Sequence, residues 1–532
     1  HFGSRSGSCP SLGRSPAAPA MAAKISLVLA GSAVVLVQTL LQKYHGGKDF
    51  YWVWAAIISI SSAIVSGLVL LAQCLGSDAT AERMHFVALF LIIVWIAGTS
   101  VMTVKAPYAH TGNGYFGAWL ALSMSWLLAT ERFPTLKEPL DMLVSQGGWL
   151  VALLLLASAT VFGQTVWNCI DSSDWCNGEA LWVLCCSGVS LFMTVLLIAP
   201  SCARKAQPVF RLVAAFFAVW WSAGFCVATF DYPYAQTGNG FFGCWVALIA
   251  SLMLLESSWG LNAAKAAETI VGQLPRELLV TLLASVIVLI ASLYHKDRST
   301  VWDWWAVLCS AVSVGVTLVV LGMLYVGNST VSNYMYRVSV FLFCWWIFGA
   351  GLMTSQGPFR VTSNGYFGAW IAVIATCMHC LSQSQGWSAF SGRLGDHGGA
   401  FVVILLCSMA LLVQALVDCM DGDVPCSGNW AWAIAVSCVS LIVWIVMALA
   451  YTQIQDWVKW IVFCLAILWG VGAGILTFEG PYVYTGNAYF SSWAAFWACS
   501  YLLVQLFPQV AEKAGVANLS VPGPSVIGSA RM

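Results

Sequence analysis

Long apolar runs alternate with short polar connections along almost the whole chain. An apolar run of about 20 residues spans the hydrocarbon core of a bilayer when it is helical, because each residue adds about 1.5 Å. Runs of this kind predict about 16 spanning helices. We expect them over residues 25–42, 50–73, 84–104, 113–131, 147–166, 179–199, 209–230, 239–256, 276–294, 302–326, 338–355, 364–381, 399–418, 430–451, 458–478 and 487–508.

The composition supports the same class of protein. Of the 532 residues, 60% are hydrophobic and only 8% are charged, whereas soluble domains carry roughly 25% charged residues. The 22 Lys and Arg residues balance 22 Asp and Glu residues, so no basic surface for a nucleic acid can form. These numbers exclude a soluble protein, a disordered chain and a nucleic-acid partner. They predict an all-α integral membrane protein whose main partner is the lipid bilayer.

A frame of 25 residues occurs four times without a gap and reads W-x2-G-x4-T-x3-P-x5-N-x5-W. Its Asn residues are separated by 126, 125 and 123 positions. Nearly constant spacing of one frame indicates an internal repeat. The frame residues are Trp95, Gly98, Thr103, Pro107, Asn113, Trp119, Trp221, Gly224, Thr229, Pro233, Asn239, Trp245, Trp346, Gly349, Thr354, Pro358, Asn364, Trp370, Trp469, Gly472, Thr477, Pro481, Asn487 and Trp493.

The repeat predicts the domain organisation. We expect four tandem parallel repeats of a four-helix transmembrane bundle, because an even number of helices returns the chain to the same side of the membrane. The sequence leaves open whether they form a ring or a row. Residues 1–24 are expected to be a leader that is disordered or not native, and 511–532 a flexible cytoplasmic tail. The four repeats are placed at 25–137, 138–270, 271–393 and 394–510.

Charge and cysteine positions predict the orientation. Most of the Lys and Arg residues fall on the side that holds both termini, which the positive-inside rule assigns to the cytoplasm. We therefore expect a membrane of the secretory pathway, a vesicle or the plasma membrane. The pairs Cys169/Cys176 and Cys419/Cys426 lie in short loops on the opposite side, where conditions would be oxidising. Two disulfides are expected there, with two pairs of free thiols as the alternative.

Each part of the repeated frame has a structural interpretation. In the first repeat, Trp95 and Gly98 share a helix face, which allows a neighbouring helix to approach closely. Thr111 or Asn113 can cap the fourth helix, and Trp119 suits interfacial depth. This interpretation makes the frame a brace between third and fourth helices. The alternative is a carbonyl filter like that of potassium channels. The fourth copy argues against a filter, because it has Ala488 in place of Gly.

One polar residue recurs in first helices at Gln38, Gln164 and Gln414, with Val288 at the matching place in the third repeat. A buried Gln can hydrogen-bond between helices. The same residues are also the candidate lining of a path for a small polar or neutral solute. The sequence leaves both interpretations open.

Signals of enzymatic chemistry do not accompany this pattern. The seven His residues are scattered, without the H-E-x-x-H spacing, and no phosphate-binding or dinucleotide fingerprint follows a predicted strand. We therefore expect no catalytic, cofactor-binding or metal-binding residues.

The architecture resembles the MARVEL-type tetraspan family of synaptogyrin and synaptophysin relatives. Four helices per unit, short loops, cytoplasmic termini and W-x-x-G in the third helix carry this resemblance. The T-x-N-G-Y-F-x-x-W signature also resembles multi-spanning membrane proteins of unicellular algae and other protists. The chain departs from the tetraspan family in having four fused units. The W-x-x-G pairs are Trp95-Gly98, Trp221-Gly224, Trp346-Gly349 and Trp469-Gly472.

The resemblance implies a non-enzymatic role in organising membrane or vesicle components through helix packing, with other membrane proteins as partners. The alternative function is a channel or carrier for a small polar or neutral solute, with its path between repeats. A scaffold should have dry bundles, and a transporter should have a continuous polar path.

Overall fold

The computed structural model describes residues 17–43, 50–75, 79–133, 149–171, 176, 178–198, 209–260, 274–295, 300–384, 386, 397–420 and 426–507. Within these ranges the chain is helical and has no β-strand, only one isolated bridge between Gly112 and Tyr484. The expected all-α class is therefore confirmed.

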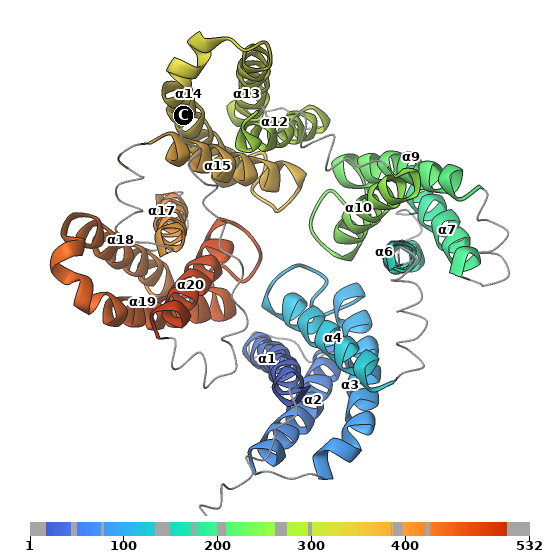
Figure 1. Cartoon of the computed structure of the whole chain (residues 1–532). Helices are drawn as coiled ribbons and strands as arrows, with labels where there is room; N and C mark the ends of the chain where they lie inside the picture. Colours follow the sequence, from blue (N-terminus) through green and yellow to red (C-terminus); the bar gives the residue numbers. More distant parts are fainter. Residues whose placement is uncertain are drawn as a thin grey trace, which may run out of the picture.

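The helices form four groups of four around a common centre (Figure 1). The first group contains α1 (Ala17–Lys43), α2 (Phe50–Cys74), α3 (Ala79–Val104) and α4 (Asn113–Arg132). The second contains α6 (Trp149–Asp171), α7 (Gly178–Ile198), α9 (Phe210–Cys226) with the π-helical turn η3 (Val227–Asp231), and α10 (Asn239–Trp259).

The third group contains α12 (Arg276–Tyr294), α13 (Val301–Tyr325), α14 (Ser329–Ser355) and α15 (Asn364–Gln383). The fourth contains α17 (Gly398–Met420), α18 (Asn429–Ile454), the 3-10 turn η5 (Gln455–Trp457), α19 (Val458–Gly474) with the π-helical turn η6 (Ile475–Glu479), and α20 (Asn487–Leu506). The observed helices match the expected ranges to within a few residues, except that α1, α3 and α14 begin earlier and α6 ends five residues later.

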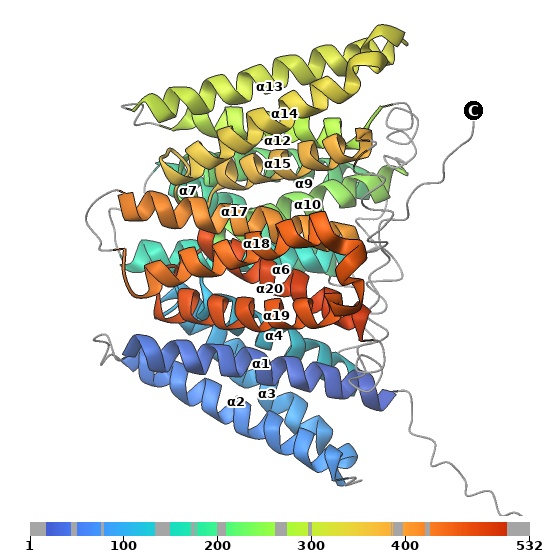
Figure 2. The same cartoon turned by 90° about the vertical axis from the view of Figure 1, so that its left-hand side faces the viewer.

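The helices lie roughly parallel to one another (Figure 2). Thirteen described segments are long and apolar enough to cross a membrane. One of them, residues 429–479, joins α18 and α19, while α4 and α20 are not among the thirteen. Many large apolar side chains are exposed along the helices, as a lipid-facing surface requires. The chain is therefore a polytopic membrane protein.

Each group has its own hydrophobic core, drawn from four consecutive helices. In each core, hydrogen bonds link one Trp and two Ser side chains from three helices, a set that we call the Ser–Ser–Trp thread. In the first group the buried Trp95 Nε1 donates to Ser62 Oγ on α2 at 2.8 Å, and Ser32 Oγ on α1 donates to the same Ser62 at 2.9 Å. The same contacts join Trp221, Ser190 and Ser158, then Trp346, Ser313 and Ser285, then Trp469, Ser440 and Ser408. The serines on the second helices lie 33, 31, 33 and 29 residues before the Trp of the frame, and they were not predicted.

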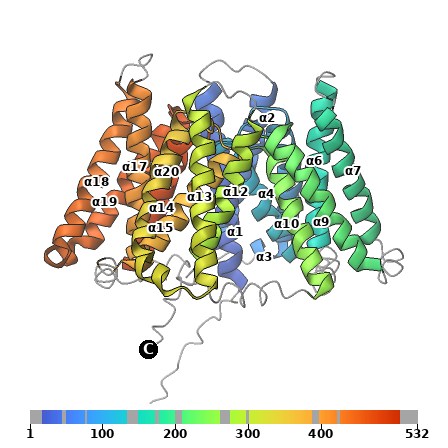
Figure 3. The same cartoon turned by 90° about the horizontal axis from the view of Figure 1, so that it is seen from above.

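The four groups form a closed ring. α12 contacts η3 of the second group, α14 contacts α17, and α1 contacts η6 of the fourth group, which brings the two ends of the described chain together. We call the side of the ring where third helices connect to fourth helices the hairpin side, and the opposite side the terminal side. The groups lie closer together on the hairpin side and spread apart towards the terminal side (Figure 3).

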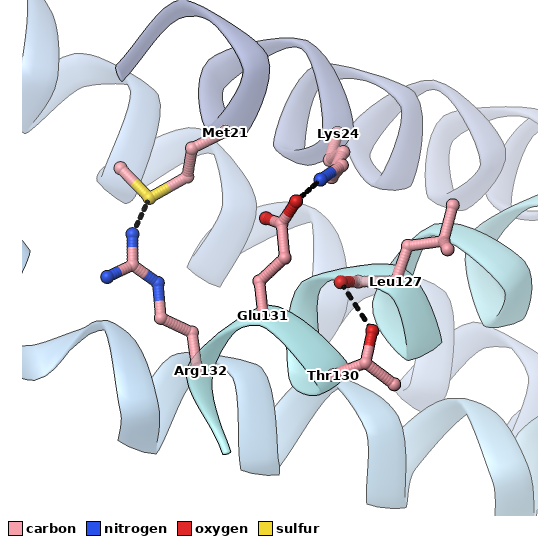
Figure 4. A network of polar contacts seen from close by, with 6 residues as sticks. All are labelled: Met21, Lys24, Leu127, Thr130, Glu131 and Arg132. Atoms are coloured by element: carbon pink, nitrogen blue, oxygen red, sulfur yellow. Dashed lines mark hydrogen bonds and ion pairs between the residues drawn. The ribbon is translucent and has the colours of Figure 1, made fainter. Parts of the chain in front are cut away.

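The expected leader is partly wrong, because α1 begins at Ala17 and residues 17–24 are helical. Lys24 forms an ion pair with Glu131, and the Arg132 guanidinium contacts Met21 Sδ, so this turn is held against α4 (Figure 4). Thr130 meanwhile donates to the Leu127 carbonyl within α4. The expected boundaries at 137/138, 270/271 and 393/394 and the tail at 511–532 lie outside the described residues.

Close packing of α1 on α4 generates a first prediction. A Cβ added at Gly31 would lie 2.7 Å from the Gly117 carbonyl oxygen and 3.0 Å from Ala121 Cβ. Replacing Gly31 by Ala should therefore lower the free energy of unfolding by about 1–3 kcal/mol through overpacking. The matched control is Gly67→Ala, since nothing lies within 4 Å of its Cβ. Thermal unfolding in nanodiscs measures both, and equal midpoints would contradict the α1–α4 packing.

Candidate functional site

Four threonine hydroxyls meet where the hairpins of all four groups converge. They belong to Thr111, Thr237, Thr362 and Thr485, each two residues before the Asn of the frame. The oxygens of successive threonines are 2.8, 2.6 and 3.0 Å apart, and Thr485 returns to Thr111 at 2.7 Å. We call this closed set the threonine ring. Backbone bonds from Thr237 N to Thr362 O and from Thr485 N to Thr111 O reinforce it.

The threonine ring is narrow. The centre of a square with these edges lies about 2.0 Å from each oxygen, nearer than the roughly 2.7 Å that a water oxygen keeps from a hydroxyl. Each hydroxyl hydrogen can be used on the next oxygen around the ring. The axis is therefore closed at this level, by hydroxyls that satisfy one another.

A second layer consists of one phenylalanine from each fourth helix: Phe116, Phe242, Phe367 and Phe490. The rings of Phe367 and Phe490 have centroids 6.1 Å apart, and Phe116 lies 6.4 Å from Tyr489 of the fourth group. Phe242 packs against the core of the first group. We call these four residues the phenylalanine collar; each is half-buried, and they place apolar rings at the start of the fourth helices, shortly after the threonine ring in the chain.

Beyond the collar, the face of each fourth helix that continues from its Phe is mostly apolar. On α15 the positions four, seven and eleven residues after Phe367 are Ile371, Ile374 and Met378, and all three are exposed. Residues at this spacing share one helix face. On the other fourth helices the corresponding face contains exposed Leu120, Leu127, Ile249, Met253 and Trp497, with Ser123 as an exposed polar exception.

The Asn of the frame joins neighbouring groups. Asn239 Nδ2 donates to Thr103 Oγ1 of the first group at 3.0 Å. Its Oδ1 accepts from Tyr115 Oη at 2.9 Å and from Trp119 Nε1 at 3.3 Å. We call this set an Asn clamp. Clamps recur with Asn364 on Thr229 and Trp245, Asn487 on Thr354 and Trp370, and Asn113 on Thr477, Tyr489 and Trp493.

The hydroxyl in each clamp is oriented by its own helix. Thr103 Oγ1 donates to the carbonyl of Thr99, four residues earlier, at 2.7 Å. Its lone pairs therefore remain to accept from Asn239. The threonines of the other three clamps make the same bond to the carbonyl four residues before them.

The second acceptor of the Asn amide alternates around the ring. Asn364 and Asn113 donate to the backbone carbonyls of Thr229 and Thr477, at 3.1 and 3.0 Å. Both carbonyls lie in the π-helical turns η3 and η6, and the residue four positions later is Pro, which has no N–H to offer them.

Where the third helix is α-helical to its end, a glutamine replaces that carbonyl. Asn239 donates to Gln164 Oε1 at 3.2 Å, and Asn487 donates to Gln414 Oε1 at 3.0 Å. At the third group the matching residue is Val288, and Asn364 uses the π-turn carbonyl. Each of these three clamps thus has one second acceptor.

Gln38 is the exception to the pattern of one second acceptor for each Asn amide. It lies at the interface where Asn113 already uses the π-turn carbonyl of Thr477. Its side chain is 1% exposed, and neither amide atom has a hydrogen-bond partner among the described residues. The interface between the fourth and first groups therefore contains both kinds of acceptor.

The predicted roles of the frame need correction. Neither Thr111 nor Asn113 caps α4, whose N-cap residue is Gly112 without a side-chain hydrogen bond. The polar side chains instead bond across groups, which the expected brace within one hairpin did not include. Trp119, for which interfacial depth was expected, is half-buried and donates to Asn239 of the second group. Gln38, Gln164 and Gln414 sit at three separate group interfaces, where Gln164 and Gln414 belong to clamps.

Glycines of the frame lie where packing is closest. A Cβ at Gly98 would lie 2.7 Å from Ile58 Cγ2, and one at Gly224 would lie 2.4 Å from Cys186 Sγ. The four prolines Pro107, Pro233, Pro358 and Pro481 follow cis peptide bonds. They precede aromatic residues that fold back, so that the ring of Tyr108 covers Gly114 and its hydroxyl lies 2.5 Å from that of Thr39.

The expected cysteine pairs are close enough to be disulfides. Cys169–Cys176 joins α6 to the start of α7, and Cys419–Cys426 joins α17 to the start of α18. Nearby, Tyr482 Oη donates to Asp418 Oδ2 at 3.2 Å. Burial, and then the Asp418 carboxylate, raise the pKa of Tyr482, which keeps it a donor. Groups of three or more His, Cys, Asp or Glu side chains that could hold a metal do not occur among the described residues.

No family model, curated protein or solved structure matches the chain. The site is therefore interpreted from its own geometry.

The alternating acceptors predict opposite effects for one substitution at two equivalent positions. Gln38→Val should raise the thermal unfolding midpoint, because it removes two buried polar atoms without partners, worth about 1–3 kcal/mol. Gln164→Val should lower the midpoint, because it leaves an Asn239 amide hydrogen without its acceptor. Thermal unfolding of both variants in nanodiscs measures the signs. Shifts in the same direction would contradict the alternation.

The contact between the first and fourth groups, which closes the ring, predicts different effects for the same substitution at Gly112 and Gly486. A Cβ at Gly112 would lie 2.7 Å from the Val483 carbonyl oxygen, whereas nothing lies within 4 Å of one at Gly486. Ser363 already occupies the equivalent place in the third group. Gly112→Ser should therefore destabilise the contact between first and fourth groups by about 1–3 kcal/mol, while Gly486→Ser is tolerated. Cysteine crosslinking between α1 and η6, scored against temperature, reports that contact, and equal effects of the two variants would argue against it.

Proposed function

We propose that the chain is a non-enzymatic membrane protein that organises membrane components, acting as a ring of four helical bundles preassembled within one polypeptide. The proposal is based on one observation: the polar side chains that recur in every repeat form hydrogen bonds between the groups. The threonines of the ring and the asparagines of the clamps bond to one another across groups. Among the described residues these atoms form joints between bundles and do not line an open polar route.

The surfaces left over suit contact with lipid or other membrane helices. The exposed faces of the fourth helices are apolar beyond the phenylalanine collar. An apolar face of this kind associates with acyl chains or with another transmembrane helix through packing. The ring would therefore present rigid walls to lipid both around it and along its axis on the terminal side.

A second function is conduction of a small polar or neutral solute along the axis. One observation favours it: among the described residues, the constriction that the distances show is the threonine ring, and a narrow constriction can gate a pore. The two functions differ in whether the closed axis opens in the resting membrane.

The test is reconstitution of the full chain into vesicles. We expect K⁺, glycerol and water fluxes equal to those of protein-free vesicles, since the threonine ring does not admit water. In giant vesicles near their miscibility temperature, the protein should shift that temperature by ordering lipid. Solute flux well above the protein-free value, without such a shift, would overturn the proposal in favour of conduction.

A further inference from the structure

The contact between the fourth and first groups has more hydrogen-bond acceptors than its asparagine can use. We call an Asn clamp together with its acceptors a joint. At every joint one amide hydrogen of the Asn goes to a threonine hydroxyl of the neighbouring group. The second goes either to a glutamine of its own group or to the carbonyl of a π turn. At this joint Asn113 uses the Thr477 carbonyl at 3.0 Å, although its own group also contains Gln38.

Gln38 has the same place on α1 as Gln164 has on α6. In both helices the next residue is a threonine, and its hydroxyl lies 2.5 and 2.7 Å, respectively, from the hydroxyl of the tyrosine after the frame Pro. The two helices therefore have the same register against the hairpins of their own groups. Gln38 is buried at the level where Gln164 accepts from Asn239.

A partner for the amide nitrogen of Gln38 is also present on α1. Gln164 Nε2 donates to Asn168 Oδ1 at 3.0 Å, four residues further along α6, and the first helix of the fourth group contains the same bond at 2.9 Å. Four residues after Gln38 the chain has Gln42, whose side chain also ends in an amide oxygen. Residues four apart are neighbours on a helix surface. The first group thus has both residues that a glutamine-type joint uses.

Either arrangement at this joint satisfies one acceptor and leaves the other without a donor. In the structure Asn113 bonds to the Thr477 carbonyl, and neither amide atom of Gln38 has a partner among the described residues. If Asn113 donated to Gln38 instead, the Thr477 carbonyl would lose its donor. Leaving a buried polar group unpaired has a cost of the same order in both cases. The two arrangements are therefore close in free energy.

We propose that the joint between the fourth and first groups is a conformational switch with two states. In one state Asn113 bonds to the Thr477 carbonyl and η6 is a π turn. In the other state Asn113 bonds to Gln38, and the end of α19 takes the α-helical form that α3 and α14 have around Thr103 and Thr354. π turns within helices often mark functional sites. Because α1 contacts η6, the change acts on the contact that closes the ring, whether the ring organises lipid or conducts a solute.

The experiment is fluorine NMR of the full chain in nanodiscs, with one trifluoromethyl-phenylalanine in place of Phe478. This residue lies within η6, and its ring centroid is 6.4 Å from that of Trp493, whose Nε1 donates to Asn113. We expect two resonances in exchange, seen directly or by saturation transfer, with a minor state populated to roughly 1–10%. Gln38→Val should leave a single resonance, because it removes the second acceptor.

The matched control is the same probe in place of Phe230, which lies in η3 at the joint between the second and third groups. That joint has one second acceptor, so a single resonance is expected there. Each labelled chain is first compared with the parent by thermal unfolding. If the probe at Phe478 destabilises the chain, fluorotryptophan in place of Trp493 replaces it, with Trp245 as its control.

Three results would overturn the proposal. The first is a single resonance, without saturation transfer, from the probe at Phe478 in the otherwise unchanged chain. The second is exchange of equal size from the probe at Phe230. The third is exchange at Phe478 that persists in Gln38→Val.

Discussion

A polar group inside a bilayer has no water to bond with, and that constraint accounts for the arrangement of this ring. Every hydroxyl and amide that the repeated frame places near the axis must find a partner within the protein. Thr111 and its three counterparts find one another, and Asn239 finds a threonine, a tyrosine and a tryptophan of the neighbouring group. Because these partners belong to different groups, satisfying the polar atoms also fixes how the bundles meet.

The same constraint acts inside each bundle, with a different result. The Ser–Ser–Trp thread, such as Ser32, Ser62 and Trp95, bonds within one group and ties three helices together. The threads therefore stabilise the individual bundles, and the Asn clamps stabilise the contacts between bundles. The exposed apolar surfaces of the helices carry mainly Leu, Ile, Val and Phe side chains, with some Trp, Met and Tyr.

Apolar periodicity was sufficient to predict the helices, because spanning a bilayer requires a run of known length. It predicted that each fourth helix begins at the Asn of the frame, and α4, α10, α15 and α20 do begin there. The destination of the Asn side chain could not be predicted in the same way. A repeated frame looks identical whether Asn113 bonds within its own hairpin or to the next unit. The π turns at 227–231 and 475–479 also read as ordinary helix, so the alternation between Gln164 and the Thr229 carbonyl had no sequence signal. Ser62 and its counterparts stand 33, 31, 33 and 29 residues before the frame Trp, so their spacing varies and an ungapped frame could not reveal them.

The alternation of acceptors has a consequence for the ancestry of the molecule. Clamps of one kind join the first group to the second and the third to the fourth, and clamps of the other kind complete the circle. Among the described residues, the cysteine pairs at disulfide distance also lie in the second and fourth groups. The pattern therefore has twofold rather than fourfold symmetry. A polypeptide of half this length would contain one joint of each kind, and two identical copies would close the same circle as a homodimer.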